Sequence, residues 1–228
     1  MSVLTLIRHG QATAFAKNSD RLTTLGEQQA HKLGEAWAAQ NVQFNRVVCG
    51  TLQRQRHTAE IACSYLQSCP DIEQAAAFNE YDATGITGLE LNPELETLRN
   101  AFLRNRESEN RNKYFQKFFE GAMQAWMAGK IESPGVESAA AFFERVEMGL
   151  RGIVKESTGN QRIAVFTSGG VIGRAVQWST SAPIDTALAL NWRVRNCSLT
   201  EFLFSGERVS LDLFNATGHL PPEIITYR

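Results

Sequence analysis

Short hydrophobic runs alternate along the chain with longer segments in which hydrophobic residues recur at the spacing of a helix face. Val3–Ile7 is a nearly continuous apolar run that ends shortly before Gly10. Phe44–Cys49 and Arg162–Phe166 repeat the pattern, and each is followed within a few residues by glycine. Short runs that are mainly apolar are typical of strands buried on both faces, so the three segments are predicted to be strands of a parallel sheet.

Helices are predicted between these strands. Thr24-x-x-Glu27 has the spacing of a capping box, which marks a helix start. Glu137–Val154 and Val171–Trp178 place apolar residues on one face and flank the third strand. Strands that alternate with helices predict an α/β fold, here a three-layer α/β/α sandwich with a mostly parallel sheet.

Two segments depart from this alternation. Ser198–Phe204 and Val209–Phe214 alternate in polarity around Ser205-Gly206, which predicts a β-hairpin. In the middle of the chain, Asn92-Pro93 provides an N-cap and a proline at the first helical position, and a helical pattern continues to about Lys130. We therefore expect one domain over residues 1–228 with a helical insertion at about 85–133 that lies over the sheet.

Composition and charge narrow the class of protein. The 228 residues carry a net charge of -1 and a pI of about 6.4, which argues against nucleic acid as the main partner. The four cysteines lack the spacing of a zinc site and fit reduced thiols in a cytoplasmic protein. No apolar run is long enough for a signal peptide or a membrane span, so a soluble, cytoplasmic protein is expected.

Candidate chemistry gathers where the predicted strands end. The sequences LIRHG, VVCG and VFTSGG follow the three strands, and ligands of open α/β sheets bind beyond the carboxyl ends of the strands. In the first of them, a neutral His9 is a good nucleophile toward phosphorus and Arg8 offers a planar fork for phosphate oxygens. Taken alone, the triplet Arg-His-Gly also fits a structural or surface histidine.

Two further residues suit the same chemistry. A helix is also predicted after Gly50, from the helical spacing of Leu52, Ala59, Ala62 and Leu66. In CGTLQRQRHTAEIA, Arg54 lies near the start of this helix, where the side chain and free backbone N–H groups are able to face an anion, whereas Arg56 and His57 are expected at the surface. In FNEYD, Glu80 precedes a turn and is suited to protonate a leaving alkoxide and then to deprotonate water. The alternative for Glu80 is an ordinary loop carboxylate.

With these motifs assembled, the sequence resembles the histidine phosphatase superfamily, which includes the cofactor-dependent phosphoglycerate mutases. The resemblance rests on five segments in the same order along nearly the whole chain, namely LIRHGQA, LTTLGEQQA, TLQRQRHTAEIA, FNEYD and GVESAAAFFERV. It implies that His9 attacks a phosphoryl group and becomes a phosphohistidine, that Arg8 and Arg54 hold the phosphoryl oxygens, and that Glu80 is the acid and base. It implies no metal and no organic cofactor.

The segment TSGGVI departs from the family pattern. Ser168 stands where the resemblance leads us to expect a second, phosphate-binding histidine, so Ser168 is predicted to be a phosphate ligand, together with Gly169. A neutral hydroxyl donor forms a weaker bond to phosphate than a charged imidazolium does. Ser168 is a poor candidate for a serine nucleophile, because Phe166 occupies the first glycine position of the Gly-x-Ser-x-Gly elbow.

Other polar groups are candidates to compensate. His219 follows the predicted hairpin and reaches the active-site end of the sheet if the second hairpin strand runs parallel to the others; otherwise it is a plain loop histidine. Phe15 occupies the position where the resemblance predicts a phosphate-binding asparagine, which leaves Asn18 or Ser19 as substitutes.

These features favour a metal-independent phosphomonoesterase that acts through phospho-His9 on a phosphorylated small molecule or a phosphoprotein. A non-catalytic phosphate- or phosphoprotein-binding relative is the second hypothesis, because of the serine at position 168, and a phosphoglycerate mutase-type phosphotransferase is the third. The insertion is expected to influence substrate choice. Its basic residues are interpreted as a solvated helix face, with an acidic substrate or partner as the alternative: Arg99, Arg104, Arg106, Arg111, Lys113 and Lys117.

Overall fold

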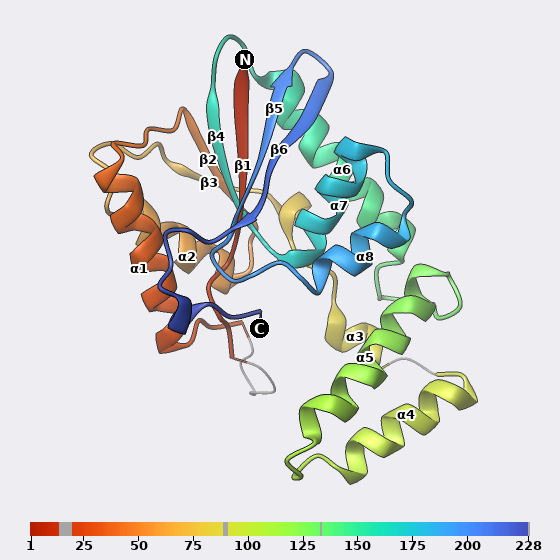
Figure 1. Cartoon of the computed structure of the whole chain (residues 1–228). Coiled ribbons are helices and arrows are strands. Elements are labelled where there is room, and N and C mark those ends of the chain that lie inside the picture. Colours follow the sequence, from red (N-terminus) through yellow and green to blue (C-terminus); the bar gives the residue numbers. More distant parts are fainter. Residues whose placement is uncertain (14–19, 89–90, 133, 228) are drawn as a thin grey trace. The chain divides into compact units, whose positions relative to one another are not determined.

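The computed structural model describes residues 1–13, 20–88, 91–132 and 134–227. The chain forms two compact units (Figure 1). The first, unit 1, consists of Met1–Glu80 and Arg145–Arg228, and the second, unit 2, consists of Tyr81–Glu144. All the predicted strands belong to unit 1, and the predicted helical insertion falls within unit 2.

Unit 1 contains a six-stranded sheet with the strand order β3-β2-β4-β1-β5-β6. Strands β3, β2, β4 and β1 run parallel, and β5 pairs antiparallel with both β1 and β6. The sheet is therefore mostly parallel, as predicted. The strands are β1 (Ser2–Arg8), β2 (Arg46–Cys49), β3 (Ile72–Gln74), β4 (Arg162–Thr167), β5 (Leu199–Ser205) and β6 (Arg208–Ala216).

The burial of each strand follows its sequence pattern. Strand β4 is buried from Ile163 to Thr167, and β1 is buried over most of its length, as continuous apolar runs require. Strand β5 instead alternates between buried and partly exposed positions, as expected of the hairpin. The hairpin turn places Gly206 at a φ of 57°, a backbone conformation that favours glycine.

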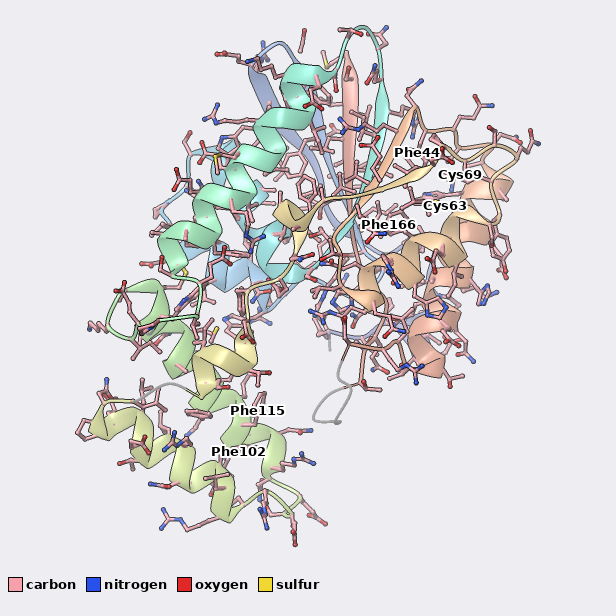
Figure 2. All side chains as sticks on the ribbon, turned by 180° about the vertical axis from the view of Figure 1, so that it is seen from behind. Phe44, Cys63, Cys69, Phe102, Phe115 and Phe166 are labelled. Atoms are coloured by element: carbon pink, nitrogen blue, oxygen red, sulfur yellow. The ribbon has the colours of Figure 1, made fainter. Side chains whose placement is uncertain are left out.

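Helices α1 (Thr24–Ala39) and α2 (Gln53–Cys63) cover one face of the sheet (Figure 1). Trp37 of α1 packs edge-on against Phe44 and Phe166, with ring centroids 5.0 and 5.9 Å apart. Figure 2 shows Phe44, Phe166, Cys63 and Cys69 in this layer. All four cysteines of the chain are free, and three of them are buried.

Helices α6 (Ala139–Glu156) and α7 (Gly169–Thr180) lie on the opposite face of the sheet (Figure 1). Both present buried apolar residues on one side, among them Val146 and Leu150 of α6 and Val171 and Ile172 of α7. Helix α8 (Asp185–Asn191) packs against α7. The three-layer α/β/α arrangement predicted from the sequence is thereby confirmed.

Unit 2 is helical. It contains α3 (Ala83–Thr87), α4 (Pro93–Arg104), α5 (Arg111–Met127) and the first turn of α6. Phe102 of α4 and Phe115 of α5 meet with ring centroids 5.3 Å apart (Figure 2). Trp126 packs against Tyr81 and donates a hydrogen bond of 2.9 Å to the carbonyl of Glu137. Unit 2 thus has an aromatic core of its own.

Several details differ from the sequence prediction. The cap of α1 is Thr23, one residue earlier than expected, and its hydroxyl accepts from the Gly26 N–H at 3.0 Å. The helical stretch after Asn92 is broken between α4 and α5. Strand β3, helices α3 and α8 and two short 3-10 turns were not predicted; the turns are Ala76–Phe78 and Pro222–Ile224. Across the described parts of the chain, none of the helices combines the length and the hydropathy that crossing a bilayer requires.

Candidate active site

The ends of the three predicted strands meet at one edge of the sheet. The His9 N–H donates to the carbonyl of Thr167 at 2.9 Å, so the residues after β1 and β4 are held together. The Gly50 N–H donates to the carbonyl of Phe166 at 3.0 Å, which brings in the residue after β2. The three loops therefore converge as expected from a parallel sheet.

The ring of His9 is held in one tautomer. Nδ1 lies 2.7 Å from the carbonyl oxygen of Gly10, which only accepts, so Nδ1 is the protonated nitrogen. Nε2 lies 3.1 Å from Nε of Arg54, which only donates, so Nε2 is the nitrogen with the free electron pair. The nucleophilic nitrogen of the imidazole thus faces the predicted phosphate-binding arginine.

The surroundings of His9 also keep the ring neutral. His9 is buried, and burial lowers its pKa well below the ordinary value of 6.5. The positive charges of Arg54 and then of Arg8 lower the pKa further, against a smaller opposing effect of the Gly10 carbonyl. A neutral imidazole at neutral pH is the form that acts as a nucleophile.

The backbone around His9 is fixed by close packing. A β-carbon on Gly10 would lie 2.4 Å from the carbonyl oxygen of Gly26, and one on Gly26 would lie 2.1 Å from the carbonyl oxygen of Gln11, which explains why both motif segments contain glycine here. The Gly10 N–H donates to Thr58 at 3.0 Å, and the Asn196 side chain donates to the His9 carbonyl at 3.0 Å. The segments LIRHG and LTTLG thus support each other directly.

Arg54 is held by an acidic residue that the sequence analysis did not single out. Nη1 of Arg54 forms an ion pair of 2.9 Å with Asp20, and the same carboxylate accepts from the Gln53 N–H at 2.7 Å. Because Leu52, the residue at the N-cap of α2, offers no side-chain cap, Asp20 supplies the anion at the start of this helix. Asp20 therefore caps α2 and orients the guanidinium next to His9.

Arg8 donates to two carbonyl groups, one between α8 and β5 and one near the end of the chain. Its Nη1 donates to the carbonyl oxygens of Tyr227, at 2.7 Å, and of Val194. Arg8 lies next to His9 in the chain and contributes to lowering its pKa, so its charge acts on the site in this arrangement.

Glu80 reaches the start of α7. Its Oε2 accepts from the Gly170 N–H at 3.0 Å, where a helix N-terminus favours a negative charge. The loop before Glu80 is anchored by the Asn79 side chain, which accepts from the Thr51 N–H at 2.7 Å. Arg145 anchors it from α6 by donating to the carbonyls of Ala76, Ala77 and Asn79 at 2.9, 3.0 and 3.2 Å.

Ser168 is the N-cap residue of α7 and is fully buried. Its hydroxyl accepts a hydrogen bond of 2.8 Å from the side-chain amide of Gln55, another residue that the sequence analysis passed over. Gly169 is the first residue of α7, and a β-carbon there would lie 2.4 Å from Oδ1 of Asn191. Ser168 and Gly169 thus adjoin Gly170, the partner of Glu80.

His219 lies at the same end of the sheet. Strand β5 is antiparallel to β1 and β6 is antiparallel to β5, so β6 runs parallel to β1 and ends at the active-site edge. Burial lowers the pKa of His219, and a hydrogen bond to the backbone of Cys197 opposes this shift. The neutral form of His219 is therefore favoured. Its Nε2 has no hydrogen-bond partner within the described ranges.

His57 lies apart from these residues, at the surface. His57 is 40% exposed and is 4.0 Å from Glu27, in agreement with a surface position. Phe15, Asn18 and Ser19 lie outside the described residues. Among the residues that are described, no group of three or more His, Cys, Asp or Glu side chains is arranged to hold a metal ion.

Asp20 and Gln55 had weak signals in the sequence. Asp20 lies more than thirty residues before the helix that it caps, and a cap supplied from such a distance leaves no local pattern. Gln55 directly follows Arg54, so its place beside a candidate ligand was visible, but a polar residue on a helix gives no sign of being fully buried.

A family model described as the histidine phosphatase superfamily (branch 1) matches residues 4–217. No curated protein matches the chain in sequence.

Several solved structures share the fold. One is a mutant of phosphoserine phosphatase from Entamoeba histolytica in complex with phosphoserine, with 18% identity, a TM-score of 0.65, and coverage of 97% of this chain and 100% of that one. A second is a putative alpha-ribazole-5'-P phosphatase from Escherichia coli, with 21% identity, a TM-score of 0.64 and coverage of 95% and 98%. A phosphoglycerate mutase from Bacillus anthracis has 17% identity, a TM-score of 0.64 and coverage of 96% and 94%.

Proposed function

Because the chain belongs to the histidine phosphatase superfamily, we propose that it is a metal-independent phosphomonoesterase that works through a phosphohistidine at His9. One observation carries the proposal. His9 is buried and neutral, its Nδ1 proton is bound to the Gly10 carbonyl, and its unprotonated Nε2 faces Arg54 at 3.1 Å. This is the arrangement that a nitrogen nucleophile beside a phosphate-binding cation requires.

The first step forms the phosphohistidine. As the substrate binds, Arg54 exchanges its bond to Nε2 for phosphoryl oxygens, and Arg8 adds a second cation. Nε2 of His9 then attacks phosphorus, the P–N bond forms and the P–O bond to the leaving group breaks. Glu80, in its protonated form, gives its proton to the departing alkoxide. The two arginines stabilise the charge on the phosphoryl oxygens in the transition state.

The second step releases phosphate. Glu80, now a carboxylate, takes a proton from a water molecule, and the water oxygen attacks phosphorus as the P–N bond breaks. His9 returns to its neutral form and inorganic phosphate leaves. The hydrogen bond from the Gly170 N–H to Oε2 of Glu80 supports this role, because it holds the carboxylate at the start of α7.

Ser168 and Gly169 are proposed as further phosphate ligands at the start of α7. The Ser168 oxygen is an acceptor toward Gln55, so its own proton is available for a phosphoryl oxygen. Because Ser168 is fully buried, this contact requires a local movement when the substrate binds. The bond would be neutral, and it would contribute less than a charged donor in the same place.

The test is phosphate release from p-nitrophenyl phosphate in the presence of EDTA. We expect turnover by the wild type and loss of at least about a hundredfold in kcat with His9→Ala, because the nucleophile is removed. Rapid acid-free quenching of the wild type should also trap a phosphohistidine that His9→Ala lacks. Turnover that is abolished by EDTA, or that survives His9→Ala, contradicts the proposal.

Two alternatives give different results in the same experiment. A phosphate- or phosphoprotein-binding relative, which is favoured by the neutral Ser168, binds phosphate without turnover. A phosphoglycerate mutase-type enzyme moves the phosphoryl group between positions of a sugar acid and releases little free phosphate. Isothermal titration with phosphate and product analysis with 3-phosphoglycerate distinguish these two outcomes.

A further inference from the structure

We propose that Gln55 is a positioning residue for proton transfer by Glu80. The inference rests on the function proposed above and assigns a role to a buried side chain that the chemical steps do not use. Gln55 joins the helix of Arg54, the loop of Glu80 and the start of α7 through hydrogen bonds of a single amide group.

The orientation of the Gln55 amide follows from its partners. One amide atom lies 3.0 Å from the carbonyl oxygen of Phe78, and because a carbonyl only accepts, this atom is the nitrogen Nε2. The same nitrogen lies 2.8 Å from Oγ of Ser168, which therefore acts as the acceptor. Both protons of the amide are thus used, one toward the Glu80 loop and one toward α7.

These two hydrogen bonds lie on either side of the contact between Glu80 and Gly170. Phe78, two residues before Glu80, is bound by Gln55, and Ser168, two residues before Gly170, is bound by the same amide nitrogen. Glu80 itself accepts from the Gly170 N–H at 3.0 Å. Gln55 therefore binds both sides of the contact that places the carboxylate, and its loss would loosen the position of Glu80 relative to the start of α7.

The rest of the loop does not depend on Gln55. The Phe78 carbonyl also accepts from the Thr167 hydroxyl at 2.7 Å, and Asn79 and Arg145 hold the neighbouring backbone. Replacing Gln55 should consequently leave the loop folded and loosen only the position of Glu80.

Gln55 is expected to contribute little to the free energy of folding, so an effect of its replacement on turnover can be told apart from an effect on stability. Gln55 is fully buried, and its Oε1 has no hydrogen-bond partner in the portion of the chain that is described. An unsatisfied buried oxygen opposes the gain from the two hydrogen bonds that the amide donates, so the net contribution of Gln55 to folding is small. A leucine of similar volume should be tolerated by the fold, and any large effect on turnover then reports on the site.

The experiment compares two leaving groups. An alkoxide leaves only with a proton from the general acid, whereas p-nitrophenolate leaves readily without one. Gln55→Leu should therefore lower kcat/KM for glycerol 2-phosphate about tenfold more than kcat/KM for p-nitrophenyl phosphate. Glu80→Gln should show the same difference between the two substrates, but a larger one. Glu60→Gln, on the exposed side of the same helix, is the matched control and should change neither value.

A second variant reaches Gln55 without replacing it. A β-carbon on Gly50 would lie 1.9 Å from Oε1 of Gln55 and 2.8 Å from Oδ1 of Asn79. Gly50→Ala must therefore displace both amides, and its leaving-group effect should be at least as large as that of Gln55→Leu. The positioning role is overturned if kcat/KM falls equally for both substrates, or if it does not change in folded Gln55→Leu and Gly50→Ala. Wild-type turnover that survives His9→Ala overturns the proposed function instead, so the two failures are distinguishable.

Discussion

At the scale of single residues, the protonation state of His9 links the chemistry to stability. The folded protein lowers the pKa of His9 well below 6.5, so the folded state disfavours the imidazolium. Between the lowered pKa and 6.5 the unfolded chain binds more protons than the folded one, and the free energy of unfolding therefore rises with pH in this window. Above pH 6.5 both states hold a neutral ring, and the pH dependence from His9 disappears.

His9→Gln should remove this dependence. We expect the free energy of unfolding of the wild type to fall, relative to the variant, by up to about 1.4 kcal/mol per pH unit as the pH drops below the ordinary pKa of histidine. Urea denaturation across acidic to neutral pH measures the difference. His219 has a lowered pKa as well, but it is present in both proteins and cancels. Parallel stability profiles for the two proteins would contradict the lowered pKa of His9.

The fully buried pair of Ser168 and Gln55 gives a second prediction at this scale. Ser168→His inserts an imidazole where the neighbouring amide lies 2.8 Å away, so overpacking should lower the free energy of unfolding by about 1–3 kcal/mol. Adding Gln55→Ala vacates the space and should restore at least half of the loss. Thermal unfolding of the wild type, the two single variants and the double variant forms a double-mutant cycle. If the changes in the free energy of unfolding of the single variants add up to that of the double variant, the two residues are not coupled.

At the scale of elements, the start of α2 depends on Asp20. Its carboxylate accepts from the Gln53 N–H, is 3.4 Å from the Arg54 N–H and pairs with the Arg54 guanidinium. Asp20→Ala should lower the free energy of unfolding by about 1 kcal/mol through the lost cap. It should also lower kcat/KM, because Arg54 loses its orientation next to His9.

Asp20→Asn separates the two roles of this residue. An asparagine oxygen still caps the helix, so stability should be close to that of the wild type, while the charge partner of Arg54 is lost. Chemical denaturation and steady-state kinetics on both variants give the two readouts. If Asp20→Asn and Asp20→Ala lower stability equally, the carboxylate acts as a charge and not as a cap.

Some of the helices, strands and helix caps can be predicted from the sequence, and others cannot. Patterns that lie within one element are reliable: Asn92 caps α4 by accepting from the Leu95 N–H at 2.9 Å, and the apolar runs become the central strands. Strand β3 was missed because its three residues are largely exposed and it depends on pairing with β2. The cap from Asp20 and the burial of Gln55 arise only when distant segments meet, so no local pattern reveals them.

At the scale of the whole molecule, the chain leaves unit 1 after Glu80 and re-enters it at Arg145, whose guanidinium binds the carbonyl of Asn79. The candidate site belongs to unit 1, including His9, Arg54 and Ser168. Unit 2 has its own core, and basic side chains of α4, of α5 and of the turn between them are exposed, among them Arg104, Arg106, Lys113 and Lys117. Unit 1 thus contains the residues proposed for the chemistry, and an influence of unit 2 on the choice of substrate stays a prediction.

Trp126→Ala tests the division of labour, because Trp126 is buried in unit 2 against Tyr81 and Phe142. The cavity should destabilise unit 2 by about 3–5 kcal/mol, whereas Leu103→Ala, at a 48% exposed position of the same unit, should cost less than about 0.5 kcal/mol. Hydrogen exchange should show faster exchange in α5 with β1 and β4 still protected. Turnover of p-nitrophenyl phosphate should persist while differences in kcat/KM among larger phosphomonoesters shrink. Equal loss of protection and of activity throughout would mean that the two units fold and act as one.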